Sequence, residues 1–148
     1  MKISTKGRYG LRAMVDMAVF SSGDHVPLGA VAERQNISMN YLEQVFASLR
    51  KAGLVKSVKG AQGGYILAQH PSLIKVGAIL RVLEGSLSVT DNDDNQNLDK
   101  KSIQYCLKIQ VWDKMNTCLN ELVDSVTLED LANDYRRLNG KEEIMYYI

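Results

Sequence analysis

The period of the hydrophobic pattern changes near residue 54, and this change limits the folds open to the chain. Before it, apolar residues recur at steps of three and four, which is the period of amphipathic helices. Ser4 and Ser38 each precede such a pattern as candidate N-caps, and Gly53 follows the last pattern as a stop. We therefore expect three helices, over about 5–20, 28–34 and 39–52.

A β-hairpin is predicted directly after these helices. Residues 54–58 and 65–68 are typical of strands, and the glycine-rich stretch 59–64 between them is typical of a turn. Three helices followed by a hairpin is the order of a winged helix-turn-helix domain, in which the second helix of the turn motif enters the DNA major groove. The expected fold class is therefore mainly α with a small β-hairpin wing.

Charge is divided unevenly along the chain. Residues 1–85 hold 11 Lys and Arg against 5 Asp and Glu, a net of +6, whereas residues 86–148 hold 7 against 12, a net of −5. A basic first part indicates a polyanionic partner, and the alternative is chance clustering on solvated faces. We place a winged helix-turn-helix DNA-binding domain at 1–85, a mobile acidic loop at 86–100, and a dimerisation helix with a C-terminal segment at 101–148.

Helical patterns resume on both sides of the predicted loop, which itself holds four Asp and three Asn in 86–100. We expect a short helix at 76–83 ended by Gly85, a long helix at about 101–123, and a short last helix from a capping box at 127–130 to about residue 135, ended by 139–140. The apolar tail 144–148 is expected to be covered by other residues.

An apolar stripe runs along the predicted long helix with near-heptad spacing. Its members are Ile103, Leu107, Val111, Met115, Leu119 and Leu122. Because the helix lies outside the compact N-terminal motif, a second copy of the chain is the simplest partner for the stripe. A dimer would also place two recognition helices one DNA turn apart, about 34–36 Å. The alternative is a helix that folds back on its own N-terminal domain.

Five runs of residues resemble one family of bacterial regulators in their order and spacing. The runs are Met1–Leu11, Ile37–Gln44, Leu49–Val55, Val58–Tyr65 and Arg81–Gly85. On these motifs, which cover essentially the whole chain, the sequence resembles the Rrf2 family, which includes IscR-type iron–sulfur regulators and CymR-type repressors of cysteine metabolism. The resemblance implies a homodimeric winged-helix transcription factor, most often a repressor, that binds a palindromic operator.

The resemblance also implies which residues contact DNA. Gln44 can pair with adenine and Glu43 can accept from cytosine N4, although Glu43 could instead pair with a neighbour on the helix surface. The N-terminal cations would face phosphates, or alternatively form a solvated basic face. The wing glycines would allow close approach to DNA, or simply a tight hairpin. The expected DNA contacts are Lys2, Lys6, Arg8, Ser38, Asn40, Tyr41, Glu43, Gln44, Arg50, Lys59, Gly60, Gly63 and Gly64.

The same resemblance raises the question of a [2Fe–2S] cluster, which IscR-type members hold through three Cys at six-residue spacing and a His three positions beyond the last. Cys106 matches the last Cys, but Lys100 and Asp94 stand at the earlier positions and Ile109 replaces the His. Cys118 lies twelve residues further, about 18 Å along a helix, too far to share a metal or a disulfide with Cys106 in one chain.

We therefore expect no conventional cluster and no metal site, with Cys106 as a redox residue or a remnant of a cluster site. The alternative for both cysteines is a small apolar packing residue, and a contact of either with its own copy in a dimer stays open. The loss of ligands resembles CymR-type members, for which the resemblance implies a cysteine-synthase partner. Other parts of the N-terminal domain resemble IscR, so the subgroup stays open.

Other classes of protein are disfavoured by what the sequence lacks. The two His have no partner at zinc-ligand spacing, and the glycine-rich stretch lacks the Lys-Ser/Thr of a phosphate-binding loop, so we expect no enzyme. No apolar run approaches the roughly 20 residues of a membrane span, and two Cys are too few for a disulfide scaffold. We expect a cytoplasmic protein, and a winged helix that binds only protein is the remaining contrast.

Overall fold

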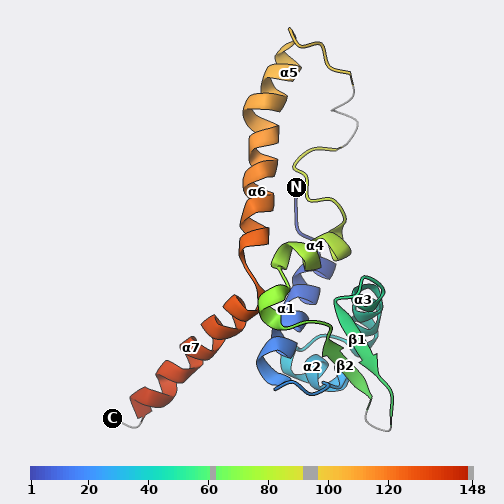
Figure 1. Ribbon diagram of the computed structural model, residues 1–148, viewed down its shortest axis with the longest axis vertical. Helices are drawn as coiled ribbons and strands as arrows, with labels where there is room; N and C mark the ends of the chain where they lie inside the picture. Colours follow the sequence, from blue (N-terminus) through green and yellow to red (C-terminus); the bar gives the residue numbers. More distant parts are fainter. Residues whose placement is uncertain (61–62, 92–96, 147–148) are drawn as a thin grey trace.

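A computed structural model describes residues 1–60, 63–91 and 97–146 of the chain. Four helices and a hairpin form a compact body, and two further arms leave it in different directions (Figure 1). The body holds α1 (Thr5–Phe20), α2 (Leu28–Gln35), α3 (Met39–Lys51), β1 (Val55–Val58), β2 (Gly64–Leu67), the short η1 (Pro71–Leu73) and α4 (Val76–Glu84). The arms are formed by α5 (Ile103–Leu107), η3 (Lys108–Trp112) and α6 (Asp113–Ser125), and by α7 (Leu128–Tyr146).

The first three helices are confirmed, with boundaries close to those expected. The Ser4 hydroxyl accepts the Gly7 N–H at 3.3 Å and so caps α1. After α3, Gly53 takes a φ of +81°, the left-handed conformation that glycine adopts without strain. The core between these helices is apolar and closely packed, and each large side chain buried in it contributes about 1.5–3 kcal/mol. Its largest fully buried members include Met14, Met17, Leu42, Phe46 and Leu49.

One buried carboxylate fixes the angle between α1 and α2. The Asp16 side chain is fully buried and accepts two bonds from Arg34, at 2.7 and 2.9 Å, and one from Gln35 Nε2 at 2.9 Å. This carboxylate raises the pKa of Arg34 through the side-chain bond. Because a buried charge is tolerated only when it is paired, the end of α2 is held against the middle of α1.

The hairpin is antiparallel, with Val55 opposite Leu67 and Val58 opposite Gly64. A bridge attaches it to the body, because Val26 N–H donates to the Tyr65 carbonyl at 2.8 Å and Tyr65 N–H donates back at 2.9 Å. The Phe46 and Tyr65 rings lie 5.1 Å apart. The wing is therefore joined both to the segment between α1 and α2 and to α3.

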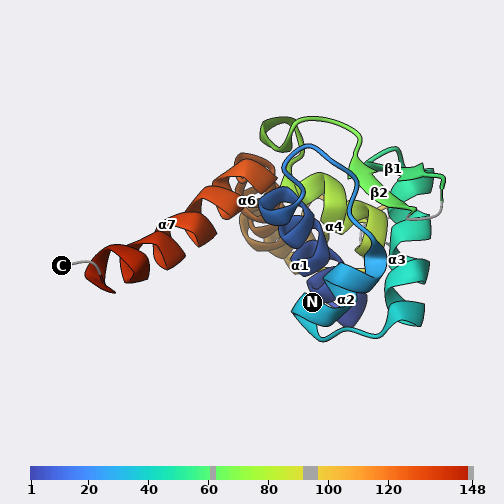
Figure 2. The same ribbon diagram turned by 90° about the horizontal axis from the view of Figure 1, so that it is seen from below.

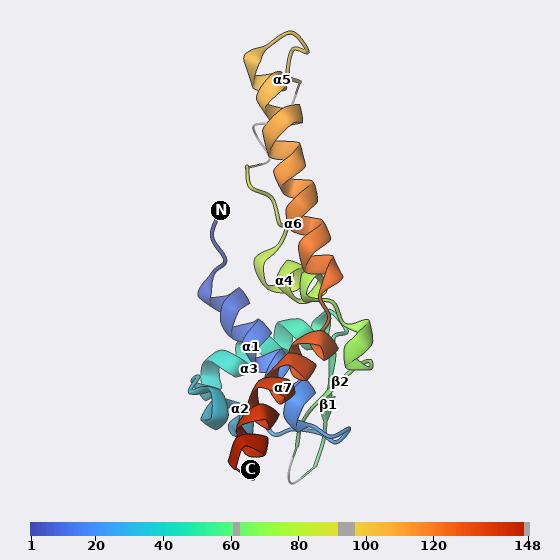
Figure 3. The same cartoon turned by 90° about the vertical axis from the view of Figure 1, so that its left-hand side faces the viewer.

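The long helix forms as expected but is not uniform. Its α-helical parts, α5 and α6, are separated by a π-helical turn, η3, over Lys108–Trp112. The lower part packs on α4 through a small apolar cluster of Val76, Leu80, Leu87 and Val123. The upper part stands clear of the body (Figure 3). Much of the apolar stripe is exposed, and Ile103 keeps 81% and Leu122 61% of its surface.

The last helix is longer than expected. The capping box is present, since Thr127 N–H donates to Asp130 and Asp130 N–H donates to the Thr127 hydroxyl. The helix does not end near Tyr135, however, and continues through Gly140 to Tyr146, so the predicted stop at 139–140 is wrong. Its first turns complete the N-terminal core through Leu128 and Ala132. The predicted cover of the tail 144–148 concerns side chains outside the described residues.

The predicted acidic loop begins as an attached segment. Leu87 is buried, and Val89 N–H donates to the Asn116 side chain at 2.8 Å. Residues 92–96 lie outside the described residues, so the expected mobility of 86–100 and the division into domains stay predictions. Among the described helices, none is long and apolar enough to cross a membrane.

Candidate nucleic-acid interface

One face of α3 is exposed along its whole length and lies at the edge of the molecule opposite α7 (Figure 2). The opposite face is buried in the core, which fixes the rotation of the helix. The exposed face carries Met39, Asn40, Glu43, Gln44, Ala47, Arg50 and Lys51. Amide, carboxylate and guanidinium groups on an exposed helix face can bond to base edges and phosphates in a major groove.

Glu43 lies on the exposed face without a cationic partner among the described residues. No salt bridge joins it to a lysine or arginine within the described parts of the chain. The Glu43 carboxylate therefore forms no surface ion pair with any of those residues, which was the alternative to base contact. Glu43 and Gln44 both remain exposed and available to a ligand.

The start of α3 is rigidly placed by its cap and by an aromatic pair. The Ser38 hydroxyl accepts the Tyr41 N–H at 3.1 Å, and Asn36 turns the chain before it with a φ of +54°. The Tyr41 ring meets the Tyr9 ring of α1 edge-on at 6.0 Å. Ser38 is therefore the N-cap that the sequence indicates. Tyr41 is half-buried against α1, at the edge of the exposed face of α3.

Cations on α1 gather around that aromatic pair. The Arg12 guanidinium lies 4.8 Å and that of Arg8 5.9 Å from the centre of the Tyr9 ring. Lys2 and Arg8 are exposed, and Lys6 is half-buried. Arg12 also donates to the Gln35 carbonyl at 2.7 Å, which links α1 to the last residue of α2. Arg12 is not among the DNA contacts expected from the sequence, and no local pattern pairs it with Gln35, which lies 23 positions away.

The wing lies at the other end of α3. Lys59 and Gly60 are exposed at its tip, and Gly60 has a φ of +143° that favours glycine. Gly63 N–H donates to the Gly60 carbonyl at 3.1 Å, while 61–62 lie outside the described residues. Gly64 also allows close packing, because a Cβ there would lie 2.4 Å from the Val26 carbonyl oxygen. The approach of the segment between α1 and α2, and not the hairpin turn, therefore requires glycine at this position.

The structure brings most of the predicted residues together around α3 as three groups, whereas no contact joins Lys2 or Lys6 to this helix among the described residues. Arg8 and Arg12 adjoin its first turn through the Tyr9–Tyr41 contact, and its own polar face lies in the middle. The wing adjoins its C-terminal end through the Leu54 N–H bond to the Leu49 carbonyl at 3.0 Å. Arg50, near that end, is exposed. No acidic ion pair covers these cations within the described residues.

The cysteines do not form a ligand set. Cys106 on α5 and Cys118 on α6 are both free and exposed in the single chain, so neither is buried against its own chain. Ile109, at the position of the family's His, is exposed and cannot coordinate a metal. Among the described residues no three His, Cys, Asp or Glu gather as metal ligands. These residues do not fit a four-ligand [2Fe–2S] centre held at this segment.

Specific DNA binding is accordingly expected to survive aerobic purification and the Cys106→Ala substitution. Cys118→Ala is the matched control, since it removes the other exposed thiol. Binding to a selected duplex, followed by fluorescence anisotropy, measures the effect. Stoichiometric iron and sulfide in anaerobically purified protein, lost in Cys106→Ala, would contradict the expectation.

Comparison with known proteins gives consistent similarities. Residues 3–134 match the Rrf2 family, described as iron-dependent transcriptional regulators. The chain is 41% identical over 149 residues to the HTH-type transcriptional regulator CymR of Bacillus subtilis, covering all of both chains. A solved structure of that regulator matches with a TM-score of 0.76, covering 90% of this chain and 97% of the other. The structure of T. potens IscR matches with a TM-score of 0.73 and 47% identity, covering 93% and 90%.

Proposed function

Because this chain belongs to the Rrf2 family and is a DNA-binding transcriptional regulator, we propose that it binds a palindromic operator as a homodimer and acts as a repressor. The family and the relatives are regulators and not enzymes. The observation that carries the proposal is the polar face of α3, exposed and flanked on both sides by cations. We further propose that the protein acts in the cytoplasm, where its DNA target lies.

The proposed contacts divide into base readout and phosphate positioning. Asn40, Glu43 and Gln44 on the exposed face of α3 would read base edges in the major groove. The other contacts would fix the register on the sugar-phosphate backbone. They are Lys2, Lys6, Arg8, Ser38, Tyr41, Arg50 and Lys59 with the wing residues Gly60, Gly63 and Gly64.

Dimerisation through the long helix is supported by the exposure of its apolar stripe. Ile103, Leu107 and Met115 lie beyond the part of the helix that packs on α4. Exposed apolar side chains in a continuous row are typical of a protein interface. The body is basic and the C-terminal part is acidic. We therefore expect the body to bind DNA and the long helix to bind the second copy of the chain.

The signal to which the regulator responds is a separate part of the proposal. The missing cluster ligands favour a CymR-type regulator over the alternative, an IscR-type iron–sulfur or redox regulator. In that alternative Cys106 would be the redox residue or the remaining cluster ligand. One relative is named the global cysteine regulator of B. subtilis. A cysteine-synthase partner, implied by the CymR-type resemblance, stays a proposal that mixing the two purified proteins can test.

Salt dependence tests the DNA-binding proposal, and Lys59→Ala tests the wing. The wild type should bind duplex DNA with an affinity that falls steeply with salt, because each neutralised phosphate releases counterions. Lys59→Ala should weaken binding to all sequences evenly and lower the magnitude of the salt slope by about 1. Lys101→Ala, which removes an exposed lysine before α5, is the control. An unchanged slope in Lys59→Ala would show that the wing tip does not contact phosphate.

A further inference from the structure

The base of the long helix is joined to the start of α4 by backbone hydrogen bonds. Val76 N–H donates to the Val126 carbonyl at 2.9 Å, and Leu128 N–H donates to the Ile74 carbonyl at 2.9 Å. These bonds fix the position of the α6–α7 junction on the body. Attachment at one end does not fix the angle between a helix and the body. The angle of α6 therefore depends on contacts further along the helix, away from this junction.

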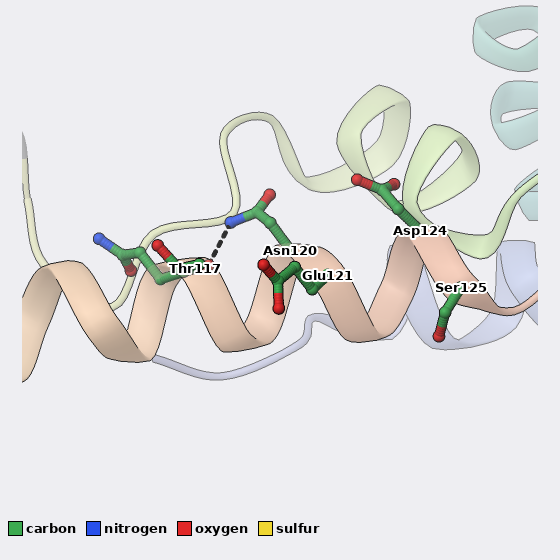
Figure 4. A pocket seen from close by; sticks show the side chains of 6 residues that line it. Thr117, Asn120, Glu121, Asp124 and Ser125 are labelled. Carbon is green, nitrogen blue, oxygen red and sulfur yellow. Dashed lines mark hydrogen bonds between the residues drawn. The ribbon is translucent and has the colours of Figure 1, made fainter.

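A second attachment lies on the side of α6 that faces α4. Arg81 donates to both carboxylate oxygens of Asp124, at 2.7 and 2.9 Å, and to Asn120 Oδ1 at 2.7 Å. Figure 4 shows Asn120 and Asp124 projecting toward α4 and the segment after it, whereas Ser125 points away. Asn120, Asp124 and Ser125 line a depression of about 580 Å³ on α6.

Glycine lets the two helices approach each other at this point. A Cβ on Gly77 would lie 2.1 Å from Asp124 Oδ1 and 2.7 Å from Arg81 Nη1. The Arg81 guanidinium lowers the pKa of Asp124, chiefly through their hydrogen bond, so the pair stays charged at neutral pH. The bidentate pair is directional, because both N–H bonds are satisfied at only one relative orientation of the groups.

The upper end of the attachment is made by two asparagines. Asn116 Oδ1 accepts from Val89 N–H at 2.8 Å, and Asn120 Nδ2 donates to the Leu87 carbonyl at 3.2 Å. Together, Arg81, Asn116, Asn120 and Asp124 form what we call the polar clamp. From Asn116 to Asp124 it extends about 12 Å along α6 at 1.5 Å per residue. Above the clamp, the exposed upper part of the apolar stripe begins.

We propose that the polar clamp sets the operator spacing that the dimer accepts, by fixing the angle between the DNA-binding body and the long helix. The proposal rests on the proposed function, because it needs DNA contact by α3 and dimerisation through the stripe. The apolar cluster beside the clamp holds α4 and α6 together but is non-directional, so it resists separation of the helices more than their rotation. In a dimer joined at the upper helix, that angle determines the distance and rotation between the two α3 helices.

The physical consequence concerns the second half-site. After one half-site is bound, the other is reached at an effective concentration that depends on how narrowly its recognition helix is placed. A loosened clamp widens the range of positions that the second recognition helix takes. Affinity then falls at the preferred operator spacing, and the loss of affinity at neighbouring spacings becomes smaller. Contacts within each half-site are not changed.

The test uses the full chain and a palindromic duplex that the wild type selects from a random library. Binding is measured on this duplex, on versions with one to three base pairs added or removed at the dyad, and on a single half-site. Arg81→Ala and Asn116→Ala loosen the clamp at different heights. Arg137→Ala is the control, since it removes a 2.8 Å pair with Asp134 that lies on α7 outside the clamp. Sedimentation and thermal unfolding verify that each variant is a folded dimer.

Both clamp variants should lower the ratio of palindrome to half-site affinity by about tenfold and flatten the dependence on spacing, with half-site affinity within about twofold of the wild type. The charge-reversed pair, Arg81→Asp with Asp124→Arg, should recover part of the spacing preference.

Loss of stability alone lowers binding to all duplexes equally and leaves their ratio unchanged. Folded dimeric variants with the spacing curve of the wild type would overturn the inference alone. A wild type that selects no palindrome would overturn the proposed function as well.

Discussion

Leu107→Glu combined with Met115→Glu is expected to convert the dimer into monomers that no longer bind palindromic DNA tightly. Both side chains are exposed in the single chain, at 43% and 46%, on the part of the long helix that stands clear of the body. Glutamates facing each other across an apolar interface would lose their hydration and repel. Without the dimer, the second half-site is no longer bound intramolecularly, so affinity should fall by about 10²–10⁴.

Sedimentation velocity at micromolar concentration and anisotropy on the palindrome measure the two effects. Gln110→Glu with Thr117→Glu is the matched control, because it adds the same two charges to exposed positions outside the stripe. The half-site affinity of the double Leu107 and Met115 variant should approach that of the wild type. A wild type that sediments as a monomer under these conditions would contradict the prediction.

Substitution of Glu43 or Gln44 by alanine is expected to change which operator positions matter. Each side chain is exposed on α3 near its first turn, where recognition helices reach base edges. Loss of one good contact should cost about 1–3 kcal/mol at one base pair of each half-site and little at the others. Measuring the affinity for a panel of singly altered operators identifies the position.

Glu33→Ala controls for the removal of one negative charge from the turn motif, since Glu33 is exposed on α2 outside the proposed contact face. It should raise the affinity for all duplexes slightly, through electrostatics alone. If Glu43→Ala and Gln44→Ala also shifted all duplexes evenly, base readout by these residues would be the wrong interpretation.

Local patterns were sufficient for the elements of the body. Ser4 and Ser38 act as the caps that their positions indicate, and Gly53 has the positive φ expected of a helix stop. The end of α7 was mispredicted because Asn139-Gly140 is typical of a stop. A glycine inside a helix costs only about 1 kcal/mol, however, and the helix continues through it.

Interactions between distant residues could not be predicted from the sequence. Arg81 and Asp124 are 43 positions apart, and no local pattern pairs them. Gly64 is predicted from the sequence only as a wing residue, and the room that its missing side chain makes for the Val26 carbonyl depends on the fold. The polar face of α3 was predictable, because its cap and its buried positions together determine which side chains face outward.

The π-helical turn η3 has a geometric consequence for the row of apolar residues on the long helix. From Ile103 to Leu119 these residues recur every fourth position, and each such step in a regular α-helix advances about 40° beyond a full turn. Over four steps the row would wind about 160° around the axis, on to the opposite side of the helix. A π turn takes more residues per turn and so removes part of this winding in the middle of the row, at Lys108–Trp112. The turn thus acts as a phase correction that keeps Ile103 and Leu107 closer to the azimuth of Met115 and Leu119.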